Sequence, residues 1–170
     1  MQMNHIILIG FMGAGKTSLG RRLARARHLT FTDTDDRIVA KMGMPVTAIF
    51  DRYGEEYFRG LETKVLQELL GEKKRCVISV GGGLPMRGEN QPYLKKLGRV
   101  IYLRAKVETL MGRLGRDNSR PMLRGGDLRT RIEELMAKRQ DTYEKVADLI
   151  IDTDGKSFER LILEISEKIS

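Results

Sequence analysis

Short apolar runs alternate with amphipathic segments along most of the chain. The runs have the length of single strands, and several are rich in the β-branched residues that buried parallel strands favour. They occupy residues 6–9, 29–31, 77–80, 100–103 and 149–151. Between them, apolar residues recur at spacings of three and four, which predicts helices. The predicted helices cover residues 19–26, 38–42, 58–70, 132–146 and 158–165.

This alternation predicts an α/β fold with a central parallel sheet of about five strands and helices on both faces. Ligands of such sheets bind at the carboxyl ends of the strands. We therefore expect the functional residues to converge at one edge of the sheet. With 170 residues, the chain is expected to form one domain spanning residues 1–170.

Residues 10–17 read GFMGAGKT, a complete G-x-x-x-x-G-K-[ST] phosphate-binding loop. Its glycines let consecutive N–H groups point at phosphate oxygens, Lys16 reaches the β- and γ-phosphates, and the Thr17 hydroxyl binds Mg²⁺. The loop follows a predicted strand and opens a predicted helix, whose N-terminus favours an anion. The sequence therefore predicts binding of a nucleoside triphosphate. The loop residues expected to contact it are Gly13, Ala14, Gly15, Lys16, Thr17 and Ser18.

Composition narrows the class of protein. Charged residues make up 32% and hydrophobic residues 41% of the chain, as in globular proteins, and no apolar run is long enough to span a membrane. The first strand begins by residue 5 or 6, so we expect no signal or transit peptide. The single cysteine, Cys76, has no partner for an internal disulfide and is expected to be a small buried side chain. These features indicate a cytoplasmic protein.

The net charge of +8 has two interpretations. Basic surfaces bind nucleic acids, and arginines also gather around small anions. The densest arginine group comprises Arg113, Arg116, Arg120 and Arg124, and no aromatic residue interleaves with it to stack on bases. We therefore expect a small-molecule substrate, and neither a nucleic acid nor a membrane, as the partner.

Asp33 and Asp35 follow the second predicted strand. One of these acidic residues is expected to cap the next helix, but a phosphate-binding loop also needs a carboxylate near its Mg²⁺. That carboxylate usually ends a later strand, where this chain offers only Ser79. We therefore expect Asp33 to lie near the metal, through a water molecule, and Asp35 to face the hydroxyl of an acceptor.

Three further features each have an ordinary structural explanation. Glycines 81–83 end the third strand, where a ligand can approach the backbone closely, or where the chain simply turns. Arg59 and Glu62 lie one turn apart on a predicted helix, a spacing that normally gives a weak surface ion pair. Arg139, also on a predicted helix, is by itself typical of a solvated side chain.

Residues 112–127 are polar, rich in glycine and too irregular for one long helix, which is typical of a lid. Arg120 within this segment is expected to reach the transferring phosphoryl group. A flexible loop with solvated arginines is the alternative. Residues 152–155, after the last strand, fit either a simple turn or the rim of an adenine pocket.

Taken together, these motifs resemble those of the shikimate kinase family, in the family's order and spacing and over nearly the whole chain. The phosphate-binding loop is shared by many kinases, whereas the remaining set is much more specific. The matching pieces are GFMGAGKT at 10–17, DTD at 33–35, FRGLE at 58–62, SVGGG at 79–83, RLGRDNSRPML at 113–123 and AKRQDTYEKVADLIIDT at 137–153.

The resemblance implies a three-layer α/β/α P-loop kinase fold with a mobile lid over about 112–127, and a monomer. It implies ATP-dependent phosphorylation of the 3-hydroxyl of shikimate, giving shikimate 3-phosphate and ADP on the pathway to chorismate and the aromatic amino acids. Shikimate would lie over the region of about 33–62. By position, the residues implied to bind shikimate are Asp35, Arg59, Gly82 and Arg139.

The resemblance assigns the remaining roles by position as well. The implied catalytic residues are Lys16, Asp35 and Arg120. Arg113 and Arg120 would join the phosphate-binding loop in holding ATP, with Arg113 and residues 152–158 flanking adenine. Mg²⁺ would be held by Thr17 directly and by Asp33 and Ser79 through water.

Two alternatives stay open. One is another small P-loop kinase, acting on gluconate or a nucleoside monophosphate; gluconate is also a polyhydroxy carboxylate, although the set Asp35, Arg59 and Arg139 favours shikimate. The other is a nucleotide switch or nucleic-acid module without enzymatic activity. The sequence has no Asn-Lys-x-Asp motif for reading guanine, which argues against a GTPase. Gly60 departs from the family pattern, since many members carry a larger residue there.

Overall fold

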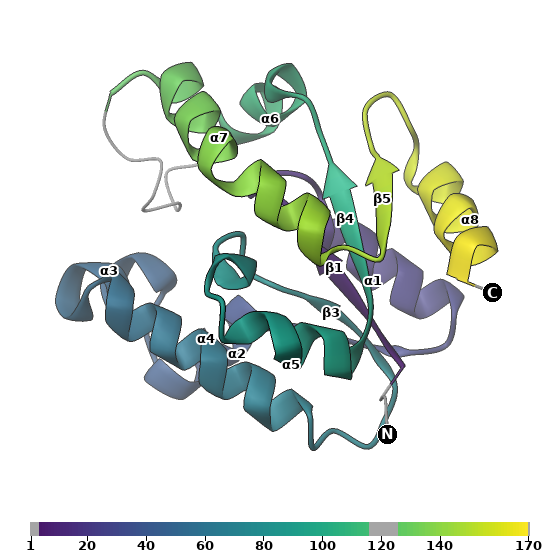
Figure 1. Ribbon diagram of the computed structural model, residues 1–170, viewed down its shortest axis with the longest axis horizontal. Helices are drawn as coiled ribbons and strands as arrows, with labels where there is room; N and C mark the ends of the chain where they lie inside the picture. Colours follow the sequence, from purple (N-terminus) through teal and green to yellow (C-terminus); the bar gives the residue numbers. More distant parts are fainter. Residues whose placement is uncertain (1–3, 116–125, 170) are drawn as a thin grey trace.

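A five-stranded parallel sheet forms the centre of the protein. The computed structural model describes residues 4–115 and 126–169, and Figure 1 shows helices on both sides of the sheet. The strands lie in the order β2-β3-β1-β4-β5. Their bounds are β1 His5–Ile9, β2 Thr30–Asp33, β3 Cys76–Ser79, β4 Gly98–Arg104 and β5 Leu149–Asp152. The predicted α/β fold and its five parallel strands are confirmed.

Helices connect the strands. They are α1 Lys16–Ala26, α2 Thr34–Met42, α3 Val46–Tyr53, α4 Glu55–Leu69, α5 Asn90–Leu97, α6 Val107–Leu114, α7 Leu128–Val146 and α8 Phe158–Ile169, with a 3-10 turn, η1, over Leu84–Met86. The periodicity located α1, α2, α4, α7 and α8 but missed the other three. Each of those three has only eight residues, too few for a three-and-four spacing to stand out.

Two hydrophobic cores lie on opposite faces of the sheet. In β1, the side chains of Ile6 and Leu8 enter one core, and those of Ile7 and Ile9 enter the other. This is the alternation that a strand covered on both faces requires. The first core is closed mainly by α1 and α8, and the second by α2, α4 and α5. None of the described helices is long and apolar enough to cross a membrane.

Helix α7 joins the two cores. Its first half contributes Ile132 and Met136 to one core, and its second half contributes Tyr143 and Val146 to the other. In Figure 1 this helix runs diagonally from beside α6 toward the start of β5. Arg139 lies at the changeover between the cores, which places it over the carboxyl edge of the sheet.

The strand order creates a crevice at that edge. From β1 the chain moves outward to β2 and returns to β3 on one side, then crosses to β4 and β5 on the other. The loops after β1 and β3 therefore leave the sheet at the position where ligands of open α/β sheets bind. They are the phosphate-binding loop and the glycine turn over residues 81–83.

Gly60 offers a direct test of how the α4 helix is stabilised. A Cβ built at this position meets no atom within 4 Å, and the backbone is helical. We expect Gly60→Ala to raise the free energy of unfolding by about 0.5–1 kcal/mol, because alanine loses less backbone entropy on folding. Urea denaturation monitored by circular dichroism measures the change.

Gly43 provides the matched control. It also has open space around a built Cβ, but its φ of +66° is left-handed. The same substitution there should lower the free energy of unfolding by about 1 kcal/mol. Equal effects of the two substitutions would contradict the assignment of their difference to backbone conformation.

Candidate active site

The phosphate-binding loop has the backbone that its sequence predicts. Gly13 and Gly15 have φ values of +83° and +94°, which side chains other than glycine rarely adopt, and α1 begins directly afterwards at Lys16. The Lys16 ammonium donates hydrogen bonds to the carbonyl oxygens of Gly10, at 2.7 Å, and Phe11, at 3.1 Å. The lysine thus lies folded along its own loop, at the place where phosphate oxygens would bind.

Thr17, Asp33 and Ser79 lie together beside this loop. The Thr17 hydroxyl donates to Asp33 Oδ2 at 3.1 Å, and the other carboxylate oxygen of Asp33 accepts the backbone N–H of Asp36 at 3.2 Å. Asp33 therefore caps α2 and faces Thr17 at the same time. Ser79 pairs with Asp33 in the register of β2 and β3. One carboxylate oxygen and two hydroxyls at a strand edge suit Mg²⁺, which keeps several waters and takes few protein ligands.

A cavity of about 400 Å³ opens at this edge. It is lined by residues of the phosphate-binding loop, the start of α2 and the end of β3. The lining includes Gly13, Gly15, Lys16, Thr17, Ser18, Asp33, Asp35, Ser79, Gly82 and Arg113. Among the residues that the structure describes, no three His, Cys, Asp or Glu side chains gather into a metal-binding cluster.

The turn over residues 81–83 uses all of its carbonyl groups. The Gly81 carbonyl accepts from the N–H of Leu84 at 3.1 Å, and the Gly83 carbonyl accepts from the N–H of Met86 at 3.1 Å. The Gly82 carbonyl accepts from the hydroxyl of Tyr143 at 2.5 Å. The N–H of Gly81 donates to the Thr34 hydroxyl at 3.0 Å. Within the described residues, the N–H groups of Gly82 and Gly83 make no hydrogen bond. Since backbone donors are rarely left without a partner, these two are available to a ligand.

Each glycine of this turn faces a charged side chain. A Cβ at Gly81 would come within 2.8 Å of Glu62 Oε2 and 2.9 Å of Asp35 Oδ1, and one at Gly82 within 3.0 Å of Arg139 Nη1. A Cβ at Gly83 would overlap the Arg59 guanidinium. The glycines therefore let side chains from α2, α4 and α7 converge on one short stretch of backbone.

Arg59 and Glu62 form a buried ion pair. Arg59 Nη1 lies 2.7 Å from Glu62 Oε1, and the two side chains are 12% and 0% exposed. Burial raises the pKa of Glu62 to about 7, despite the opposing effect of the Arg59 guanidinium. Burial alone would lower the pKa of Arg59, but Glu62 and Glu55 outweigh it and raise that pKa above its ordinary value. Arg59 is thus held charged, and fixed by carboxylates on two sides.

The expectation of a surface ion pair between Arg59 and Glu62 is wrong. Glu62 shares the buried face of α4 with Phe58, Val65 and Leu69. That spacing of four, three and four was visible in the sequence and would have identified Glu62 as a buried carboxylate. The spacing between Arg59 and Glu62 does not by itself distinguish a buried ion pair from an exposed one.

Arg139 is also buried rather than solvated. The residue is 4% exposed, its guanidinium lies over the Phe11 ring at 5.9 Å from the ring centroid, and Nη1 has no hydrogen bond within the described part of the chain. The expectation that Arg139, taken by itself, is a solvated side chain is therefore wrong. A buried arginine with an unused donor that faces a glycine turn is suited to an anionic ligand.

A second, smaller cavity adjoins the first. Its volume is about 50 Å³, and it shares Met12, Asp35, Gly81 and Gly82 with the larger one. Arg59, Glu62, Gly83 and Arg139 supply its remaining polar lining, and Val46, Phe50 and Phe58 its apolar side. The small cavity suits a compact ligand that carries a carboxylate and hydroxyl groups, placed next to a bound nucleotide.

Arg113 lies at the phosphate-binding loop. Its guanidinium donates to the Gly13 carbonyl at 2.9 Å. Arg113 belongs to α6, as do residues 112 and 114 of the segment expected to form a lid. Arg120 lies outside the described residues, as does the rest of the range 116–125. The lid and the role of Arg120 therefore stay predictions.

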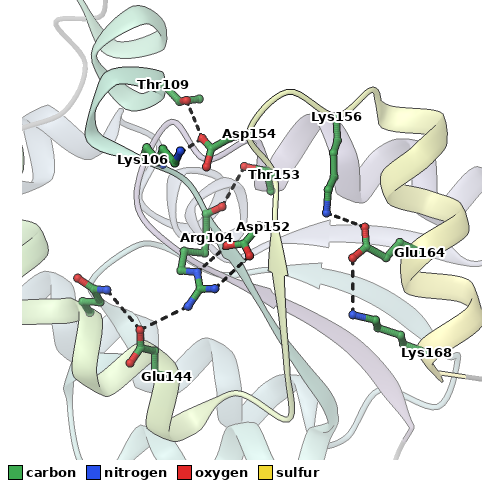
Figure 2. A network of polar contacts seen from close by, with 11 residues as sticks. Arg104, Lys106, Thr109, Glu144, Asp152, Thr153, Asp154, Lys156, Glu164 and Lys168 are labelled. Carbon is green, nitrogen blue, oxygen red and sulfur yellow. Dashed lines mark hydrogen bonds and ion pairs between the residues drawn. The ribbon is translucent and has the colours of Figure 1, made fainter.

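The segment after β5 makes a network of polar contacts within the protein (Figure 2). Asp152 binds Arg104 through two hydrogen bonds, of 2.6 and 3.0 Å, and this contact lowers the pKa of Asp152. Asp154 accepts hydrogen bonds from the backbone N–H of Lys106 and the hydroxyl of Thr109, which connects this segment to the start of α6. These carboxylates are thus engaged with β4 and α6, and a contact with adenine stays a prediction.

The comparison with known proteins decides the family. A family model described as shikimate kinase matches residues 12–170. The chain belongs to the shikimate kinase family. The shikimate kinase of Thioalkalivibrio sulfidiphilus is 44% identical over 165 residues, covering 97% of this chain and 86% of the relative. That of Francisella tularensis subsp. holarctica is 39% identical over 166 residues, covering 98% and 94%.

Solved structures agree with this assignment. A shikimate kinase from Acinetobacter baumannii in complex with shikimate superposes with a TM-score of 0.93 at 37% identity, covering 98% of this chain and 92% of that one. A gluconokinase from Sinorhizobium meliloti reaches a TM-score of 0.58 at 14% identity, covering 99% and 97%, which shows a shared fold alone. The chain is therefore a P-loop kinase of the shikimate kinase family, whose members use ATP.

Glu62 should make the stability of this shikimate kinase family member depend on pH. Its pKa is raised from 4.5 to about 7 in the folded state, so between these values the folded chain binds more protons than the unfolded chain. The stabilisation linked to the Glu62 proton is therefore fully present below pH 4.5 and is lost as the pH rises through about 7. At 1.36 kcal/mol per pKa unit, the loss is on the order of 3 kcal/mol. We expect it in the wild type and not in Glu62→Gln, as measured by urea unfolding at about pH 5 and pH 8.

Glu55→Gln is the matched control for that measurement. Glu55 also pairs with Arg59, at 3.1 Å, but its side chain is 50% exposed. This variant should keep the pH dependence of the wild type. If wild type and Glu62→Gln lost equal stability between the two pH values, the raised pKa of Glu62 would be wrong.

Proposed function

We propose that the protein transfers the γ-phosphoryl group of ATP to the 3-hydroxyl of shikimate, giving shikimate 3-phosphate and ADP. This reaction belongs to the biosynthesis of chorismate and the aromatic amino acids. Membership of the shikimate kinase family supports it, as does the shikimate complex of the A. baumannii relative. The single observation that carries the proposal is the convergence of Asp35, Arg59 and Arg139 on the glycine turn, beside the phosphate-binding loop.

The chemistry of these groups matches shikimate, a small ring with one carboxylate and three hydroxyls. Two guanidinium groups, Arg59 and Arg139, suit the carboxylate, because arginine donors match the fork of its two oxygens. The Asp35 carboxylate suits the ring hydroxyls as an acceptor, and the Gly82 N–H is an available donor. The apolar side of the smaller cavity suits the carbon face of the ring.

Positioning and charge neutralisation would carry most of the rate. Phosphoryl transfer has a loose transition state with charge spread over three oxygens, so it needs ordered donors more than a strong base. Lys16 would leave the loop carbonyls and bind the β- and γ-phosphates. Asp35 would orient the attacking hydroxyl and accept its proton. Arg120, in the proposed lid, would bind the transferring group, with Arg113 and residues 152–158 toward adenine.

We propose Mg²⁺ as the metal, held directly by Thr17 and through water by Asp33 and Ser79. The contact between the Thr17 hydroxyl and Asp33 Oδ2 supports this, because both residues line the larger cavity. When bound, Mg²⁺ would neutralise charge that develops on the phosphate oxygens during transfer. Asp33 would keep its helix-capping bond throughout, which fixes the carboxylate in place.

We further propose that the protein acts as a monomer in the cytoplasm. All of the side chains assigned to shikimate come from one chain, so the site needs no residue from a second copy. The content of charged and apolar residues and the single cysteine support the location.

A panel of acceptors tests the proposed function. ADP release should saturate with shikimate and stay near background with gluconate or nucleoside monophosphates, measured in a coupled assay at equal concentrations. Gluconate is the informative competitor, because it is also a polyhydroxy carboxylate and because the gluconokinase of S. meliloti shares the fold. Stronger turnover with any other acceptor than with shikimate would overturn the substrate assignment.

Arg139→Ala should weaken shikimate binding by about 10- to 100-fold, which corresponds to losing a charge-assisted hydrogen bond of about 1.5–3 kcal/mol. Binding of ATP should stay within about twofold of the wild type, since the phosphate-binding loop is unchanged. Isothermal titration calorimetry with each ligand separates the two affinities. Lys138→Ala is the control, because Lys138 precedes Arg139 on α7, carries the same charge and is exposed. Equal shikimate affinities of the two variants would count against the proposed role.

A further inference from the structure

Tyr143 lies directly beneath the proposed shikimate site. It sits one helical turn after Arg139 on α7, is fully buried, and packs its ring against Tyr102 with centroids 5.0 Å apart. In the sequence it is one of the apolar positions at helical spacing in the helix predicted over residues 132–146, which predicts a core position and no more. A core position needs no hydroxyl, yet this hydroxyl binds one group of the site and has a second group close by.

The first of these groups is the carbonyl of Gly82. The Tyr143 hydroxyl donates to this oxygen at 2.5 Å, which is at the short end for a hydrogen bond between two oxygens. The peptide that follows Gly82 is trans, as are all the described peptide bonds. Its carbonyl and the N–H of Gly83 therefore point in opposite directions. Because the carbonyl is held toward the core by Tyr143, the Gly83 N–H points away from the core.

The second group is the Arg139 guanidinium. Its Nη1 lies 3.0 Å from a Cβ built at Gly82, the residue to which Tyr143 donates. Burial raises the pKa of Tyr143, and the charge of Arg139 opposes part of that rise. The hydroxyl therefore stays protonated. It donates to Gly82, and the Arg139 guanidinium of the same helix faces the same glycine turn.

We propose that Tyr143 is a positioning residue for substrate binding. Its hydroxyl fixes the peptide between Gly82 and Gly83, so that the Gly83 N–H becomes a second backbone donor to the substrate. Arg139, on the preceding turn of α7, faces the same stretch of backbone. The inference rests on the proposed function and deepens it, since it adds a donor and a supporting side chain to the shikimate site.

Three observations on the turn support this arrangement. The N–H of Gly83 makes no hydrogen bond within the described residues, although Gly83 is buried. Gly83 lines the smaller cavity together with Arg59 and Arg139. Every carbonyl of the turn already has a donor, so the turn presents only N–H groups to a ligand. A pocket that offers donors from both backbone and arginine is suited to a carboxylate.

Tyr102 gives a matched control for the hydroxyl. It is buried, its ring packs on that of Tyr143, and its hydroxyl oxygen has no hydrogen bond within the described part of the chain. Tyr102→Phe and Tyr143→Phe therefore remove the same atom from neighbouring rings. Only the second substitution removes the hydrogen bond between α7 and the glycine turn.

Calorimetry on the two variants tests the proposal. In Tyr143→Phe the dissociation constant of shikimate should rise about three- to tenfold, the range expected for one hydrogen bond, while that of ATP changes less than about twofold. Tyr102→Phe should match the wild type for both ligands. A purely structural role would instead lower the melting temperature or weaken both ligands together. Unchanged shikimate affinity in Tyr143→Phe, or equal effects of the two variants, would overturn the inference.

Amide hydrogen exchange on the free protein separates this inference from the proposed function. Exchange at the glycine turn should be several-fold faster in Tyr143→Phe than in the wild type or in Tyr102→Phe, because the turn loses its contact with α7. This measurement needs no shikimate. Absence of shikimate binding by the wild type would refute the proposed function, whereas unchanged exchange in Tyr143→Phe would refute the role of Tyr143.

Discussion

The site depends on the approach of charged side chains to a stretch of backbone that has none of its own. At residues 81–83, a Cβ on any of the three glycines would collide with, or press closely on, a carboxylate or a guanidinium. Without that freedom, Asp35 from α2, Arg59 from α4 and Arg139 from α7 would not reach the end of β3 together. Three consecutive glycines cost conformational entropy on folding. In return, charged side chains and backbone N–H groups line the same pocket.

Burying the charged side chains around the glycine turn is unfavourable unless each is paired within the protein or by a bound ligand. Glu62 offsets part of the cost by holding Arg59 at 2.7 Å, and Glu55 holds it from the solvent side. Arg139 rests over the Phe11 ring and against Tyr143, but keeps Nη1 without a partner among the described residues. The two arginines therefore differ in how many of their hydrogen-bond donors are already paired, and this difference suits a binding site. Arg59 is held in place before a substrate arrives, and Arg139 has a donor that is available to a substrate.

The sequence predicted most of the fold because long-range order here follows from local patterns. Strand-length apolar runs, helical spacing and the loop over 10–17 were enough to derive the parallel sheet and its functional edge. Burial of individual polar residues was harder to predict, as Glu62 and Arg139 show. An arginine or glutamate on a helix has the same spacing whether its face meets water or a second helix. Only the packing of α4 and α7 against the glycine turn distinguishes the two cases. The contact of the Tyr143 hydroxyl could not be predicted either, because helical spacing does not show which group a buried hydroxyl meets.

Helix α7 connects the nucleotide side of the site with the acceptor side. It follows the segment that contains Arg120, passes from one hydrophobic core to the other, and carries Arg139 and Tyr143 on the turn where it crosses. The first half of α7 packs on α6, whose Arg113 holds the Gly13 carbonyl at 2.9 Å. One rigid helix therefore contacts an element of the phosphate-binding side at one end and the acceptor side at the other. An acceptor bound to Arg139 would therefore contact α7 itself, and a nucleotide bound near Arg113 would contact the helix against which α7 packs.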